Sequence, residues 1–132
     1  MTDVLSIALS GLTAQTQRVA VAANNIANIS TAGRVPTDAN PASTVYKPLG
    51  ISLTALTSGG VQARVAEDKN GTSVSYDPSN YYANESGYLA VPNVDLAREI
   101  VNVLESKVLF RANVSVIKTQ EKMLGDLLDA IG

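Results

Sequence analysis

Residues 94–131 read VDLAREIVNVLESKVLFRANVSVIKTQEKMLGDLLDAI, and this stretch carries the strongest structural signal in the chain. An apolar side chain returns at every seventh position, at Leu96, Val103, Phe110, Ile117, Leu124 and Ile131, with Ile100, Val114 and Leu128 between them. Spacings that alternate between four and three residues put these side chains on one stripe of a helix, which packs against another helix. The pattern therefore predicts a C-terminal assembly helix over residues 93–132.

This stretch is long for a helix in a small domain. As a continuous helix it is about 55 Å long at 1.5 Å per residue. A compact domain of this chain length has a radius of gyration of about 14 Å. Such a helix projects beyond any small globule, so its apolar stripe needs a partner, as in a coiled coil or a helical assembly.

The N-terminal segment repeats the seven-residue pattern. Its apolar positions are Leu5, Leu12, Val19 and Ile26, with Leu9, Thr16 and Ala23 between them. Only Asp3 and Arg18 are charged over residues 2–29, whereas exposed helices usually carry many charged pairs. We expect an N-terminal assembly helix within residues 1–33 that has neighbours on several sides. The alternative is one buried helix paired with the C-terminal segment in a hairpin.

Three asparagines, Asn24, Asn25 and Asn28, stand near the end of this helix, before Gly33. Asparagine is a poor helix former because its amide competes for backbone hydrogen bonds. The segment is therefore either a fraying terminus closed by Gly33 or a set of amides that bridge to neighbouring helices and fix their register. The residues leave both interpretations open.

The middle, residues 34–92, predicts a loop and a small β region. Residues 34–44 contain turn formers, and then apolar residues alternate over 49–55 and 61–66 around Gly59-Gly60. Asn70-Gly71 is a hairpin signal before Val74 and Tyr76, so we expect three antiparallel strands, followed by a short extended stretch at 88–91. Asn93 is placed to cap the second helix. The expected class is α+β: long N- and C-terminal helices forming a coiled-coil-like pair, with a small antiparallel β-hairpin or meander between them.

The composition argues against an enzyme, a metal site or a cofactor. Cysteine and histidine are absent, and the formal charge is −2 with no basic run, so nucleic acid is not an expected partner. Asp77 and Glu85 form the one conceivable acid–base pair, but both lie in turn-like sequence. No apolar run is long enough for membrane insertion, and no secretory signal precedes the first helix.

Two polar residues, Lys107 and Glu121, interrupt the stripe of the C-terminal helix. Their aliphatic stems can snorkel to the edge of a shallow interface. Alternatively, their charges select register and partner at a cost in stability, and the regular apolar flanks favour this second interpretation. The predicted assembly interface comprises Leu5, Leu12, Val19, Asn24, Asn25, Ile26, Asn28, Leu96, Val103, Phe110, Ile117 and Leu124.

Several motifs resemble those of bacterial flagellar axial proteins. The first half carries Ser10-Gly11-Leu12-Thr13-Ala14-Gln15 and Asn24-Asn25-Ile26-Ala27-Asn28. The second half narrows the resemblance to proximal rod proteins through 76–78 (YDP), 87–95 (GYLAVPNVD) and 111–114 (RANV). Another rod paralogue, or a coiled-coil adaptor outside the flagellum, is the alternative.

This resemblance implies a non-enzymatic subunit of the flagellar basal-body rod, which crosses the periplasm and transmits torque. It implies export without a cleaved signal peptide, through the flagellar type III apparatus. It also implies terminal helices that are disordered before assembly and then pack into a helical tube by self-association. The implied partners are the other flagellar rod proteins and the export-gate adaptor.

Overall fold

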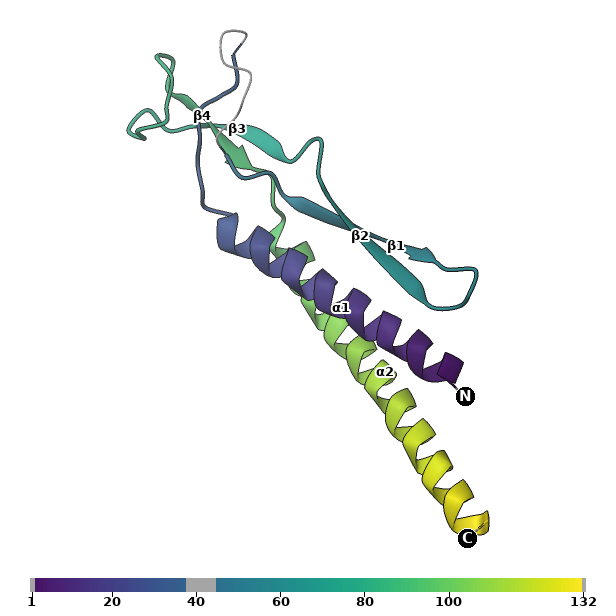
Figure 1. Cartoon of the computed structure of the whole chain (residues 1–132). Coiled ribbons are helices and arrows are strands. Elements are labelled where there is room, and N and C mark those ends of the chain that lie inside the picture. The colour runs from purple at the N-terminus through teal and green to yellow at the C-terminus, as the bar shows by residue number, and fades with distance from the viewer. Residues whose placement is uncertain (1, 38–44, 132) are drawn as a thin grey trace. The chain divides into compact units, whose positions relative to one another are not determined.

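The computed structural model describes residues 2–37 and 45–131. Its elements, in chain order, are α1 (Thr2–Asn28), β1 (Leu49–Ala55), β2 (Val61–Glu67), β3 (Thr72–Tyr76), β4 (Tyr88–Pro92) and α2 (Leu96–Ile131), as labelled in Figure 1. The α+β class with long helices at both ends is therefore confirmed. Part of the loop expected over 34–44 falls on residues 38–44, which lie outside the described residues.

The chain divides into two compact units, and each unit contains parts of both helices and of the strands between them. The first consists of Met1–Ala20, Ile51–Arg64 and Val101–Gly132. The second consists of Val21–Gly50 and Val65–Ile100. The two are described separately below.

In the first unit, the turn between β1 and β2 lies against α1. Gly59 and Gly60 have positive φ angles of 87° and 86°, which glycine adopts without strain. A Cβ atom on Gly60 would lie 2.5 Å from Oγ of Ser10. The backbone N–H of Val61 donates to that same Oγ at 3.1 Å, so Ser10 joins α1 to the start of β2.

In the second unit, β3 pairs with β4 in an antiparallel ladder that runs from Thr72 opposite Pro92 to Tyr76 opposite Tyr88. Gly33 adds a bridge to this sheet through two backbone hydrogen bonds with Ala90, each 2.9 Å long. The buried apolar side chains of this unit include Val45, Leu89 and Ala90.

The expected arrangement of three consecutive strands is wrong. The strands form two separate sheets, one of β1 with β2 and one of β3 with β4. The turn at Asn70-Gly71 exists, but its flanking groups bond elsewhere: the N–H of Asp68 donates to the carbonyl of Pro48, and the carbonyl of Gly71 accepts from the N–H of Asn93. These bonds direct β3 to β4 rather than back to β2.

The expected cap at Asn93 is also wrong. The helix α2 begins at Leu96, and Asp95 caps it by accepting from the N–H of Arg98 at Oδ1 (3.2 Å) and from that of Glu99 at its carbonyl (3.0 Å). A short acidic side chain at this position satisfies an orphan N–H and complements the helix dipole.

Candidate assembly surfaces

The face of α1 that is buried within the first unit consists of small residues. Ala8 and Ala14 are 2% and 1% exposed, and Gly11 is buried between them. A Cβ atom on Gly11 would lie 2.7 Å from Oδ1 of Asn113, so the missing side chain lets α2 approach closely here. Residues three apart share one face of a helix, and Gly11 on this buried face lies against Asn113 of α2 inside the subunit.

The stripe predicted on α1 lies beside this small-residue face rather than on it. Leu5, Leu12 and Ile26 are half-buried, Val19 is 37% exposed, and Leu9 is 60% exposed. The side chains predicted to form the N-terminal interface therefore retain surface that other molecules can cover.

The stripe predicted on α2 is divided between contact and exposure. Val103, Ile117 and Leu124 are half-buried, whereas Leu96 and Phe110 are 44% and 40% exposed. The residue of α2 that is fully buried is Ser106, at 0% exposure. The buried residue of α2 is therefore small, as Gly11 is on α1.

The sequence analysis missed a second apolar stripe on α2. Its members are exposed and follow spacings of three, four, seven and eight residues: Val101, Leu104, Val108, Val116, Met123 and Leu127. At 3.6 residues per turn they lie on the side of the helix opposite Phe110. Ala112 lies eleven residues from both Val101 and Met123, and this eleven-residue period places the three on the same side of the helix and is the signal that could have revealed the stripe.

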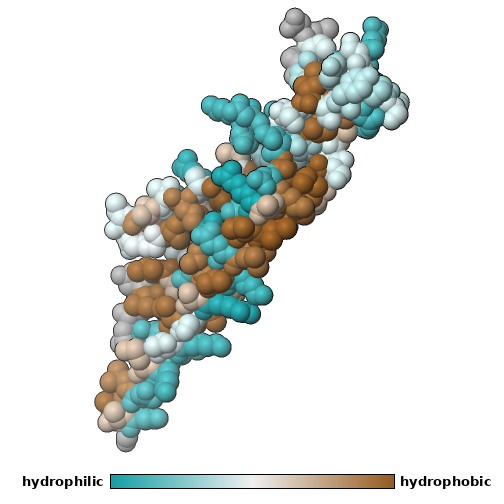
Figure 2. All heavy atoms as spheres, turned by 180° about the vertical axis from the view of Figure 1, so that it is seen from behind, coloured by the Kyte–Doolittle hydropathy of each residue, from teal (hydrophilic) through white to brown (hydrophobic). Residues whose placement is uncertain are grey.

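Figure 2 shows one face of the molecule. Apolar side chains, in brown, cover broad areas of the molecule and are only partly interrupted by polar ones in teal. Large contiguous apolar patches on a subunit usually mark contacts with other molecules.

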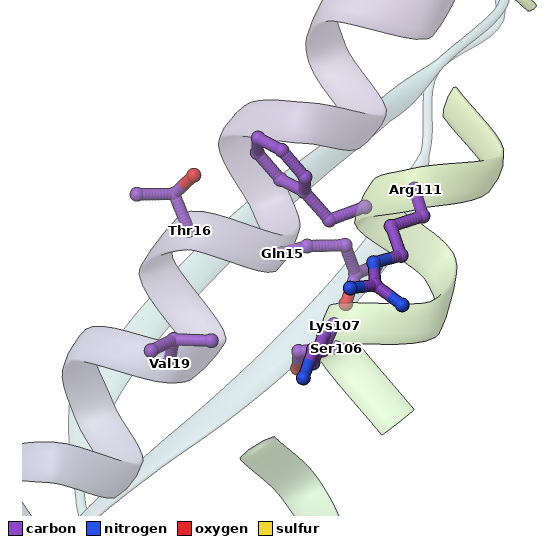
Figure 3. A pocket seen from close by; sticks show the side chains of 7 residues that line it. Gln15, Thr16, Val19, Ser106, Lys107 and Arg111 are labelled. Atoms are coloured by element: carbon purple, nitrogen blue, oxygen red, sulfur yellow. The ribbon is translucent and has the colours of Figure 1, made fainter. Parts of the chain in front are cut away.

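A cavity of about 390 Å³ lies between α1 and α2 in the first unit. Figure 3 shows Gln15, Thr16 and Val19 coming from α1 and Ser106, Lys107 and Arg111 from α2. Phe110 completes the lining. Val19, Lys107 and Phe110, which all lie on the predicted stripes, thus line the same cavity.

One ion pair joins the two helices within the first unit. Nη2 of Arg18 lies 3.1 Å from Oε2 of Glu105, and the two side chains are 17% and 53% exposed. Partial burial of the guanidinium strengthens the pair relative to a fully exposed one, although pairs of this kind contribute about 1 kcal/mol or less.

Asn25 and Asn28, near the end of α1, make different kinds of hydrogen bonds. Asn25 is 1% exposed, and its Nδ2 donates to Oε1 of Glu99 at 2.8 Å and to the carbonyl of Leu49 at 2.9 Å. Its Oδ1 accepts from the hydroxyl of Tyr46 at 2.9 Å and from the N–H of Leu49 at 2.8 Å. Asn25 therefore joins α1, β1 and α2 of the same subunit.

The side chain and the carbonyl of Asn28 make local bonds. Nδ2 of Asn28 donates to the carbonyl of Asn24 at 2.9 Å, and the carbonyl of Asn28 accepts from the N–H of Thr31 at 3.0 Å. Asn24 is exposed and Asn28 is half-buried. Asn28 thus bonds within the last turn of α1, which ends at this residue. The expectation that Gly33 closes the helix is wrong, because Gly33 lies beyond its end and pairs with Ala90.

The acidic pair considered for catalysis shows the chemistry of turn residues. Oδ1 of Asp77 accepts from the hydroxyl of Ser79 at 2.6 Å and from its N–H at 3.1 Å. These hydrogen bonds lower the pKa of Asp77, which is the opposite of what a general acid at neutral pH requires. Glu85 is exposed.

Within residues 2–37 and 45–131, no cluster of three or more acidic residues is arranged to hold a metal ion. Over the same residues, neither helix is long and apolar enough to cross a membrane.

Two family descriptions match the terminal segments that carry these surfaces. Residues 5–33 match "Flagella basal body rod protein", and residues 85–130 match "Flagellar basal body rod FlgEFG protein C-terminal". The first match covers most of α1, and the second covers β4 and nearly all of α2.

Curated relatives match along almost the whole chain. The flagellar basal-body rod protein FlgC of Escherichia coli O6:H1 is 34% identical over 122 residues, which are 92% of this chain and 91% of that protein. FlgC of Salmonella typhimurium is 31% identical over the same shares of both chains. FlgC of Borreliella burgdorferi is 31% identical over an alignment of 143 positions, which covers 94% of this chain and 93% of that protein. The chain therefore belongs to the family of flagellar basal-body rod proteins FlgC and is a structural subunit of the bacterial basal-body rod.

Proposed function

We propose that the chain polymerises in the rod through both terminal helices, and that α2 contacts different neighbours on two opposite faces. The observation that supports this most directly is the exposure of large apolar side chains on both faces. Phe110 and Leu128, on one side, are 40% and 64% exposed, and Val101 and Val108, on the other, are 61% and 66% exposed. One packed neighbour covers one face of a helix, so two faces require at least two.

Burial of these side chains drives the assembly. Each Å² of apolar surface removed from water contributes roughly 25 cal/mol, and a subunit by itself leaves most of these residues accessible. Any ordering of the helices on assembly has an entropic cost, which weakens association between free subunits. Subunits then remain unpolymerised until they reach the growing end of the rod, where several faces are covered together.

The packed helices give the rod the stiffness needed to transmit torque. We place the chain in the periplasmic part of the basal body, exported without a cleaved signal peptide. Its neighbours are other rod proteins and, at the base, the export-gate adaptor. Its role is non-enzymatic, because the side chains with suitable chemistry, such as Asp77, serve local turns.

The assembly role is tested at Phe110, which lies on the predicted stripe. Phe110→Asp places a charge in the proposed contact, so we expect loss of the chain from purified hook–basal bodies and loss of swimming. Phe110→Leu keeps an apolar side chain and is expected to assemble. The chain is quantified by mass spectrometry against known rod and hook subunits. Normal incorporation of Phe110→Asp would contradict the proposal.

A further inference from the structure

Two residues that line the cavity between α1 and α2 carry buried polar atoms without a hydrogen-bond partner among the described residues. Gln15 and Ser106 are 6% and 0% exposed, and neither Oε1 of Gln15 nor Oγ of Ser106 makes a hydrogen bond with residues 2–37 or 45–131. Burying a polar group without a partner costs about 1–3 kcal/mol. Both residues line the cavity, and an incoming acceptor can pair with the hydroxyl of Ser106, which can donate, but not with Oε1 of Gln15, which is itself an acceptor.

The remaining lining defines the chemistry of that group. Val19 and Phe110 are partly exposed apolar walls, and Lys107 and Arg111 add two positive charges. The hydroxyl of Ser106 can donate a hydrogen bond. The cavity therefore suits an apolar segment that carries negative charge and unpaired hydrogen-bond acceptors.

The end of α2, residues 126–131, has these properties. It carries Asp126 and Asp129, and its last turn contains no basic residue. Leu128 and Ile131, three positions apart on one face, are 64% and 74% exposed. The last carbonyls of a helix have no donor within the helix, and the helix dipole makes this end negative.

A subunit cannot place this end in its own cavity. Arg111 and Asp129 belong to one continuous helix, and 18 residues of helix separate them by about 27 Å. The occupant must therefore come from another molecule. Every copy of the chain carries both the cavity and the acidic helix end.

We propose that residues 126–131 of one copy dock into the cavity of a second copy. Leu128 packs against Val19 and Phe110, and Asp129 faces Lys107 and Arg111. The hydroxyl of Ser106 donates to a terminal carbonyl of the incoming helix. Such a head-to-tail contact repeats from copy to copy and so builds an open helical strand rather than a closed dimer. The inference rests on the proposed assembly through α2 and names one of its contacts.

Cysteine cross-linking tests the contact, because the chain has no cysteine of its own. Arg111→Cys and Asp129→Cys are placed on separate copies that are expressed together, and purified hook–basal bodies are oxidised. We expect a disulfide-linked dimer only when both variants are present. A disulfide requires Cα atoms within about 7 Å, so the bond reports this register.

The matched control replaces Arg111→Cys by Lys118→Cys, an exposed basic position on the same side of α2. It lies seven residues away, about 10 Å along the helix, and is expected to give no dimer with Asp129→Cys. Rods that contain both variants of the test pair but yield no dimer would overturn the proposal, as would equal dimer formation in the control. Absence of the wild-type chain from the rods would instead overturn the proposed function.

A charge exchange gives an independent measurement. Arg111→Asp is expected to lower the amount of chain in hook–basal bodies about tenfold, the factor that corresponds to 1.4 kcal/mol. Adding Asp129→Arg should restore incorporation, because each copy then supplies the opposite charge. If the double variant incorporates no better than Arg111→Asp alone, the proposal is wrong, and this result decides the question even where cysteine variants fail to assemble.

Discussion

Asn25 in α1 donates a hydrogen bond from Nδ2 to Oε1 of Glu99 in α2, at 2.8 Å. With the bonds to Leu49 and Tyr46, this amide uses both its donor and its acceptor groups inside the second compact unit. A fully satisfied buried amide specifies one arrangement of the groups around it, because any other arrangement leaves polar atoms unpaired. Asn25 therefore fixes the register between the end of α1, the start of β1 and the start of α2.

Replacing this amide should destabilise the chain more than any other asparagine change near the end of α1. Asn25→Ala leaves the N–H and the carbonyl of Leu49 without their side-chain partner, and each unpaired buried group costs about 1–3 kcal/mol. We expect the free energy of unfolding to fall by at least about 2 kcal/mol in urea denaturation followed by circular dichroism. Asn28→Ala, which removes one local bond, is the control and should change it by less than half as much.

Gly11 and Gly125 should respond in opposite ways to alanine. Alanine stabilises a helix by about 1 kcal/mol relative to glycine, and nothing lies within 4 Å of a Cβ on Gly125, so Gly125→Ala should be stabilising. At Gly11 the new methyl group would lie 2.7–2.9 Å from three atoms of the Asn113 side chain, which must move away. That side chain donates to the carbonyl of Leu109, and we expect the displacement to outweigh the gain in propensity.

Thermal unfolding of the two alanine variants checks this prediction. A higher unfolding midpoint for both variants would show that the Asn113 side chain moves away at little energetic cost. The close approach of the helices would then contribute little to stability. Gly11→Val adds further atoms at the same place and should lower the midpoint below that of Gly11→Ala.

The helix start offers a test of the cap that the structure assigns. Asp95→Ala removes the acceptor for the N–H of Arg98 and a negative charge near the N-terminus of α2, so we expect a loss of about 1 kcal/mol. Asn93 contributes its backbone N–H to the carbonyl of Gly71, which alanine retains. Asn93→Ala is therefore the matched control in denaturant titrations, and an equal loss for both variants would contradict the assignment of the cap.

The helices and most strand positions could be predicted from the sequence, because the repeat of apolar residues in each element depends only on residues close to one another in the chain. The alternation over Leu49–Ala55 coincides with β1, and the C-terminal heptads with α2. The pairing of β3 with β4 could not be predicted in the same way, because it depends on bonds from Asp68 and Gly71 to distant residues. A turn motif reports local backbone preference and does not identify which strand the next one pairs with.

The candidate surfaces could be predicted from the sequence only in part. The search for large apolar residues every seventh position found Phe110 and Val19 but passed over the small residues Ala8, Gly11 and Ser106. All three are buried in the first unit, and Gly11 lies against Asn113 of α2. Small residues add little hydrophobicity, yet they determine how closely two backbones approach. The size of a side chain and its distance from the helix axis must therefore be considered together with its polarity.

Tyr46 provides a prediction for alkaline pH. Burial and the nearby negative charge of Glu99 raise the pKa of the Tyr46 phenol above its ordinary value of 10.0, while its hydrogen bond with the backbone at Leu49 lowers it by less. The folded state thus holds the phenolic proton more tightly than the unfolded state. The stabilisation is complete below about pH 10 and is lost as the pH rises through the pKa of the folded protein.

Tyr46→Phe removes this dependence together with the bond to Asn25. Subtracting its phenolate absorbance titration from that of the wild type isolates Tyr46, whose midpoint should lie above the ordinary value of 10.0. A midpoint at or below 10.0 would mean that the phenol is not held against Asn25 and Glu99 in solution.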